Sequence, residues 1–115
     1  RVDHGSRRPQ ANAQLEDLAA RVRVLRPGWA VHTAHLEISP PGVAETLDSC
    51  AAAGVREVFI HPFFLAPGRH TREDLPKLAR EACERNPGLT VRVTDPLGVD
   101  DSVVAVVLER IDTCL

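Results

Sequence analysis

Helix-like and strand-like segments alternate along this chain of 115 residues, and short turns rich in proline and glycine separate them. Leu15, Leu18, Val22 and Leu25 recur at helical spacing, which predicts a first helix from Pro9 to Arg26. The same patterns predict strands over Ala30–Leu36, Val58–Ile60 and Leu89–Val93, and helices that follow Pro41-Gly42, contain Leu75 and begin near Asp100.

This alternation is typical of parallel strands joined by helical crossovers. A further strand is expected ahead of the first helix, at and mostly before Arg1-Val2-Asp3, since the sequence begins with Arg rather than Met. We therefore predict a single α/β domain over residues 1–115. It would hold a flavodoxin-like, doubly wound, four-stranded parallel sheet, with strand order 2-1-3-4 and helices on both faces.

Composition narrows the classes of function. The formal net charge is -2 and aromatic residues make up 3% of the chain, so neither the basic face nor the stacking platform of a nucleic-acid binder is present. The longest apolar run, Val103–Leu108, is too short to cross a membrane. We expect a cytoplasmic protein, or a plastid protein if a transit peptide has been removed.

The three cysteines, Cys50, Cys83 and Cys114, are far apart and form no CxxC pair. Widely spaced cysteines in odd number indicate free thiols rather than a zinc site or a disulfide framework.

Three residues with metal-binding side chains are evenly spaced. Glu37 follows His4 by 33 residues, and His70 follows Glu37 by another 33. One strand-helix unit takes roughly 30 residues. All three residues are therefore expected at equivalent positions in successive units, near the carboxyl ends of the strands. These ends share one edge of a parallel sheet, which is where open α/β sheets bind ligands.

Two imidazoles and a carboxylate suit a borderline divalent metal such as Fe²⁺, Co²⁺ or Ni²⁺. Three protein ligands also leave coordination positions open, as a catalytic site requires. The same groups can accept protons near neutral pH.

The same edge is predicted to be cationic. Arg7 and Arg8 follow His4, and Arg69 and Arg72 flank His70. In a chain of negative net charge, this local cluster favours an anionic substrate, whose carboxylates arginine can bind in forked geometry. The alternative is that these arginines only keep surface loops soluble.

Other polar residues have simpler interpretations. His32, His35 and His61 lie in or next to predicted strands and are expected to be structural, although His35 and His61 could line the pocket. Ser6 lacks the GxSxG context of a hydrolase and is expected to cap a turn or the first helix, or to lie near a bound anion.

Several motifs, in the same order along the chain, resemble those of one enzyme family. Val2-Asp3-His4-Gly5-Ser6-Arg7-Arg8 is similar to the opening motif of the class II chelatases. Ala34-His35-Leu36-Glu37 resembles their Ala-x-Leu-Glu segment, and Pro62-Phe63-Phe64-Leu65-Ala66-Pro67-Gly68-Arg69-His70 resembles their Pro-x-Phe-Leu-x-x-Gly-x-His signature. Asp74-Leu75-Pro76 and Pro96-Leu97-Gly98 also fit, so the resemblance covers nearly the whole chain.

The resemblance is to the sirohydrochlorin chelatases of siroheme and cobalamin synthesis, the short CbiX and SirB types. It implies insertion of Fe²⁺ or Co²⁺ into sirohydrochlorin, with metal contacts and catalysis at His4, Glu37 and His70. It also implies a homodimer, no membrane partner and no tightly bound cofactor, the divalent metal being a substrate. The Cys-rich tail of the plant forms is not present in this sequence, so no iron-sulfur cluster is expected.

The substrate of this family is a flat apolar ring with carboxylates around its rim. Apolar side chains are predicted to hold the ring face, and polar ones its rim. The residues assigned to substrate binding are Ser6, Arg7, Arg8, Phe63, Phe64, Leu65, Arg69, Arg72 and Leu97.

Three alternatives remain at this point. The first is a nickel chelatase of the same family, because ligand chemistry does not select the metal. The second is a metal or tetrapyrrole carrier without catalysis. The third is a flavodoxin-like module for a phosphorylated ligand, in which His4 and His70 would not share a metal.

Overall fold

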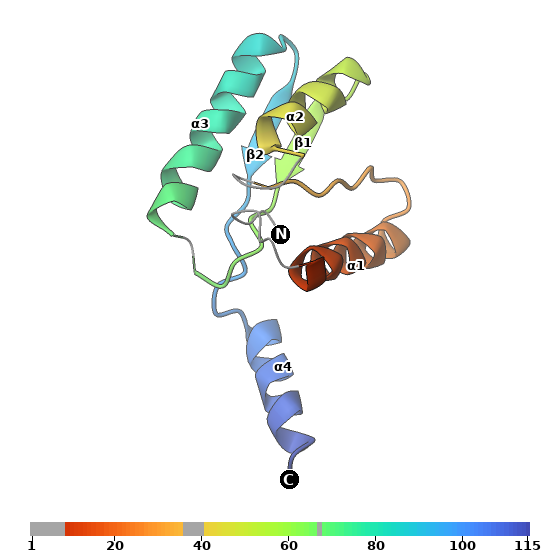
Figure 1. Cartoon of the computed structure of the whole chain (residues 1–115), viewed down its shortest axis with the longest axis vertical. Helices are drawn as coiled ribbons and strands as arrows, with labels where there is room; N and C mark the ends of the chain where they lie inside the picture. The colour runs from red at the N-terminus through yellow and green to blue at the C-terminus, as the bar shows by residue number, and fades with distance from the viewer. Residues whose placement is uncertain (1–8, 36–40, 67) are drawn as a thin grey trace.

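The computed structural model describes residues 9–35, 41–66 and 68–115 (Figure 1). Its elements in chain order are α1 (Pro9–Leu25), α2 (Val43–Ala52), β1 (Glu57–Ile60), α3 (Arg69–Arg85), β2 (Thr90–Val93) and α4 (Asp101–Asp112). Within these residues, the predicted helices and the last two predicted strands are confirmed.

The strands β1 and β2 form a parallel pair, with α3 as the crossover between them. Glu57 lies opposite Thr90, and Ile60 lies opposite Val93. Each residue of β1 therefore faces the residue 33 positions later in the chain. The parallel arrangement of these two neighbours is the one expected from the alternation of strands and helices.

The predicted strand Ala30–Leu36 is not formed over residues 30–34. His35 makes only an isolated parallel bridge to Gly42, and Leu36 lies outside the described residues. The carbonyl of Val31 instead accepts a hydrogen bond of 2.6 Å from the Arg23 guanidinium of α1. This segment is thus tied to a helix rather than to a strand. The expected strand at Arg1–Asp3 also lies outside the described residues, so two strands of the expected four are described.

One face of the sheet carries the core. Val58 and Ile60 of β1 and Val91 and Val93 of β2 alternate onto this face. The helices α2 and α3 pack over it through four buried residues, which are Val43, Leu47, Leu75 and Ala82. The helix α4 has no buried residue and projects away from the sheet (Figure 1), so within the described residues α4 does not cover a sheet face.

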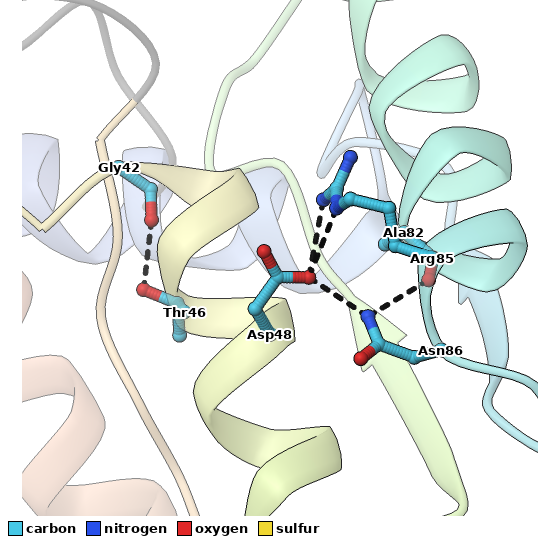
Figure 2. Close-up of polar contacts among 6 residues, drawn as sticks. All are labelled: Gly42, Thr46, Asp48, Ala82, Arg85 and Asn86. Carbon is cyan, nitrogen blue, oxygen red and sulfur yellow. Dashed lines mark hydrogen bonds and ion pairs between the residues drawn. The ribbon is translucent and has the colours of Figure 1, made fainter.

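A polar contact fixes α3 beside α2 (Figure 2). One carboxylate oxygen of Asp48 accepts hydrogen bonds from the Asn86 amide at 2.8 Å and from the Arg85 guanidinium at 3.1 Å. Asn86 also donates to the carbonyl of Ala82 at 2.9 Å. The bonds from Asn86 and then Arg85 hold the pKa of Asp48 below its ordinary value. This contact lies at the C-terminal end of α3, and the opposite end of the helix leads to the site.

The thiols behave as predicted. Cys50 is buried, Cys83 is half-buried and Cys114 is exposed, and all three are free. Burial raises the pKa of the Cys50 thiol. In the part of the chain that the structure describes, no helix has both the length and the apolarity to pass through a membrane.

Candidate functional site

The carboxyl ends of β1 and β2 continue into two connections, residues 61–66 and 94–100, that are hydrogen-bonded to each other. The N–H of Thr94 donates to the carbonyl of Ile60 at 2.8 Å, and the N–H of Leu97 donates to the carbonyl of Phe64 at 3.0 Å. The side chains of His61 and Thr94 approach to 2.8 Å. Residues that directly follow these two strands therefore meet at one edge of the sheet.

His61 is the described imidazole at this edge. Partial desolvation of the ring lowers the pKa of His61 below its ordinary value of 6.5, while a hydrogen bond to the backbone of Asp95 works in the opposite direction. The lowered pKa favours the neutral form of the His61 ring at pH 7.

A cavity of about 330 Å³ opens beside these connections. Pro62 lines it from the first connection, and Arg72 and Pro76 line it from α3. Proline has no N–H, so Pro76 cannot donate to the carbonyl of Arg72 in the preceding turn. The residues that line the cavity thus include a basic arginine and two prolines.

Residues 94–96, which the sequence interpretation did not assign to the site, complete the cavity wall. Thr94, Asp95 and Pro96 directly follow β2, as His61 and Pro62 directly follow β1. The signal that would have identified them is the 33-residue offset between the two strands, since Asp95 follows Pro62 by that distance. Asp95 and Arg72 both line this cavity, so its wall includes one acidic and one basic residue.

The predicted apolar residues of the substrate site gather at the same edge. Phe63 and Phe64 are half-buried, and Leu65 and Leu97 are exposed. The backbone bond between Leu97 and Phe64 holds the two connections together. Of the predicted arginines, Arg72 is exposed and lines the cavity.

The predicted metal ligands are described only in part. His4 and Glu37 lie outside the described residues, as do Ser6, Arg7 and Arg8. Arg69 and His70 are the first two residues of α3, and their side chains fall outside the description. His70 is thus in the first helical turn rather than in the loop after the strand. The grouping of the three ligands remains a prediction.

Among the residues that the structure describes, no three His, Cys, Asp or Glu side chains are grouped to hold a metal ion. His35, the histidine closest in sequence to Glu37, is buried, and its N–H donates to the carbonyl of Pro41 at 2.9 Å. This burial agrees with the structural role expected for His35.

The comparison with family models decides the family. The CbiX model matches residues 1–114, which is nearly the whole chain. The chain belongs to the CbiX family. The motifs around His4, Glu37 and His70 all fall within the matched region.

Two relatives of this CbiX chain differ in the share of their own length that the chain covers. It is 36% identical over 114 residues to the chloroplastic sirohydrochlorin ferrochelatase of Arabidopsis thaliana, covering 99% of this chain and 51% of that protein. It is 26% identical to the sirohydrochlorin cobaltochelatase of Methanococcus maripaludis, covering 95% of this chain and 93% of that protein. The chain thus spans about half of the first relative and nearly all of the second.

Solved structures support the fold. A CbiX protein of cobalamin biosynthesis from Marinobacter aquaeolei superposes with a TM-score of 0.78 at 23% identity, covering 97% of this chain and 91% of that one. The chelatase SirB of Bacillus subtilis, solved in complex with cobalt, superposes with a TM-score of 0.76 at 24% identity, covering 97% of this chain and 48% of that one. Both likenesses show that this CbiX chain has the chelatase α/β fold.

Proposed function

We propose that this chain is a sirohydrochlorin chelatase that inserts Fe²⁺ or Co²⁺ into the tetrapyrrole. The observation that carries the proposal is the match of residues 1–114 to the CbiX family. Relatives with both named activities, ferrochelatase and cobaltochelatase, cover at least 95% of the chain.

The proposed metal site consists of His4, Glu37 and His70. The register of the sheet supports this set, because positions 33 residues apart are neighbours across β1 and β2, and the three ligands are spaced by the same interval. Imidazole and carboxylate ligands together bind a divalent ion of intermediate softness, and they bind it less tightly than thiolates do. The three ligands leave coordination positions for the incoming pyrrole nitrogens.

The reaction requires proton transfer as well as metal delivery. Two pyrrole N–H protons leave the ring as the metal–nitrogen bonds form, and the metal loses its ligands from the protein and from water. Neutral imidazoles and the Glu37 carboxylate are suitable acceptors for these protons near pH 7. The divalent metal is consumed as a substrate, so no resident cofactor takes part.

Apolar and cationic residues are proposed to hold the tetrapyrrole. Phe63, Phe64, Leu65 and Leu97 would contact the ring face from the two joined connections. The rim carboxylates would bind to arginines and to Ser6, and the arginines are Arg7, Arg8, Arg69 and Arg72.

A homodimer is part of the proposal. The cavity of about 330 Å³ is at the low end of ligand pockets, which span roughly 300–1,000 Å³. A tetrapyrrole needs more contact surface than this cavity offers. We propose that two copies of the chain face each other across the substrate.

The test is an anaerobic insertion assay with purified chain, sirohydrochlorin and one metal at a time. Formation of the metallated ring is followed by its absorbance spectrum. We expect His4→Ala, Glu37→Gln and His70→Ala each to lower the rate by more than about 100-fold, because each removes a group that contacts the reacting metal.

His32→Ala is the matched control, since His32 is an exposed histidine distant in sequence from the predicted ligands. It should keep the wild-type rate. Binding of the tetrapyrrole or the metal without faster insertion would indicate a carrier instead. Wild-type rates in all three ligand variants would exclude the proposed site, and a preference for Ni²⁺ would indicate a nickel chelatase.

A further inference from the structure

His61 is an imidazole at the carboxyl edge of the sheet to which the proposed function assigns no role. It directly follows β1, and Thr94 directly follows β2. Nδ1 of the His61 ring lies 2.8 Å from Oγ1 of Thr94, and Thr94 also lines the cavity of about 330 Å³. His61 is exposed, so its ring is open to solvent and to a molecule bound at this edge.

The hydrogen bonds of Thr94 determine which nitrogen of the His61 ring carries the proton. Oγ1 of Thr94 lies 3.0 Å from the backbone carbonyl oxygen of Asp95, and that oxygen can only accept. The single hydroxyl proton of Thr94 is therefore donated to Asp95, because the reverse arrangement would bring two acceptor oxygens together with no proton between them. Oγ1 of Thr94 then accepts from Nδ1 of His61, and the lone pair of the neutral ring is on Nε2.

Metal insertion requires a base that is not holding the metal, an argument that rests on the proposed function. Each pyrrole N–H bond breaks as a metal–nitrogen bond forms, so the proton must leave while the metal is still being transferred. An imidazole that coordinates a metal does so in its deprotonated form, through the lone pair that would otherwise accept the proton. In the proposed site, His4 and His70 are therefore occupied when the first proton leaves.

We propose that Nε2 of His61 accepts the first pyrrole proton during metal insertion, and that Thr94 holds the ring in the tautomer that this step requires. The pyrrole N–H bond breaks, its electron pair forms the metal–nitrogen bond, and the proton forms the Nε2–H bond of an imidazolium. The second pyrrole proton goes to a ligand that the metal has just left. His61 then returns its proton to water, and no oxidant or reductant takes part.

The charges described near His61 are compatible with a ring that gains a proton. Alternation along the two strands places Glu57 and Arg92 on the same face of the sheet as His61. Their charged groups lie 4.0 Å apart and offset each other. Arg72 and Asp95 line the neighbouring cavity with one charge of each sign. The hydrogen bond from the His61 ring to the Asp95 backbone favours the protonated ring.

The first experiment determines the tautomer without metal or tetrapyrrole. Long-range ¹H–¹⁵N correlation spectra are recorded on protein with ¹⁵N-labelled histidine, at alkaline pH where the ring is neutral. The His61 signals are identified by their loss in His61→Gln. We expect the Nδ1–H tautomer in wild type and a mixture of both tautomers in Thr94→Val, which removes the hydroxyl but keeps the shape. The Nε2–H tautomer in wild type would overturn the proposal, because the lone pair would then face Thr94.

The second experiment is the anaerobic insertion assay. His61→Gln should lower kcat by about 10- to 100-fold, toward the low end for loss of a general base because water can replace the imidazole. KM for sirohydrochlorin and the absorption spectrum of bound Co²⁺ should not change, since the metal ligands remain. Thr94→Val should lower kcat by a smaller factor, and Thr94→Ser, which keeps the hydroxyl, should recover the rate. His32→Ala is again the matched control.

An added base separates proton transfer by His61 from a structural role. In His61→Ala, 2-methylimidazole should restore part of kcat in proportion to its concentration, and its methyl group hinders coordination to the metal. It should have no effect on His32→Ala. The proposal is wrong if His61→Gln inserts the metal at the wild-type rate, or if the added base does not rescue His61→Ala. Either result with an active wild type leaves the proposed function intact, whereas an inactive wild type would refute both.

Discussion

The Nδ1 atom of His61 lies 2.8 Å from the Oγ1 atom of Thr94, and the two residues are 33 positions apart in the sequence. Each directly follows a strand, so the contact shows that one strand-helix unit of this chain advances by 33 residues. The same interval separates His4 from Glu37 and Glu37 from His70. The interval between these two strands thus equals the spacing of the three proposed ligands, and this equality is the premise of the proposed metal site.

The His61 environment predicts a specific pH dependence of stability. Its pKa is lower in the folded chain than its ordinary value of 6.5, so the unfolded chain binds more protons as the pH falls through 6.5. The free energy of unfolding should therefore decrease over this interval, down to the folded pKa. We expect urea unfolding of wild type between pH 7.5 and 5 to show a steeper decrease than that of His61→Gln. Parallel curves for the two proteins would contradict this assignment.

Asp48 predicts a pH dependence at lower pH. Its pKa is lowered by the hydrogen bonds from Asn86 and Arg85, so its contribution to stability is present above the ordinary value of 3.8 and is lost as the pH falls through the folded pKa. Asp48→Ala should be less stable than wild type in urea at pH 7, and the difference should shrink as the pH approaches 3. A difference that is independent of pH would show that the contact does not act through the ionised carboxylate.

Among the residues that the structure describes, Leu75 is the leucine whose side chain has no exposed surface. Leu75 is 0% exposed and packs between α3 and the sheet, so Leu75→Ala should lower the free energy of unfolding by about 2–5 kcal/mol. Leu65 is 62% exposed, and Leu65→Ala should change the free energy of unfolding by less than about 0.5 kcal/mol. Equal effects in thermal or urea unfolding would be inconsistent with the described packing.

Arg72 is predicted to act on substrate binding. It lines the cavity at the carboxyl edge of the sheet, where a rim carboxylate could pair with its guanidinium. Arg72→Ala should raise KM for sirohydrochlorin about three- to tenfold, equivalent to about 1 kcal/mol for an exposed charged hydrogen bond, with little change in kcat. Arg80→Ala, an exposed arginine two turns further along α3, should leave KM unchanged. A loss confined to kcat would assign Arg72 another role.

Local patterns predicted the helices and the last two strands well. Leu15, Leu18 and Val22 have the period of a helix that buries one side, and Pro87-Gly88 ends α3 where the turn requires it. Glycine is favoured at position 88 because its φ is +94°. Such signals depend on a few neighbouring residues and need no knowledge of distant contacts.

Features that depend on distant partners were predicted less well. An apolar run such as Ala30–Leu36 suits a strand, but it does not reveal that the Val31 carbonyl will bond to Arg23 of α1. The apolar spacing of α4 predicts a helix, but not that it projects away from the sheet (Figure 1). Residues 94–96 line the cavity because β2 lies beside β1, and no local pattern in the sequence reveals that pairing.

The central claim is that His4, Glu37 and His70 together bind the metal, and anaerobic titration with Co²⁺ tests it without the tetrapyrrole. The visible absorption band of bound Co²⁺ reports the ligand field directly. We predict one such band in wild type and in His32→Ala, and its loss or shift in each of His4→Ala, Glu37→Gln and His70→Ala. An identical Co²⁺ spectrum and affinity in wild type and all three ligand variants would contradict the account.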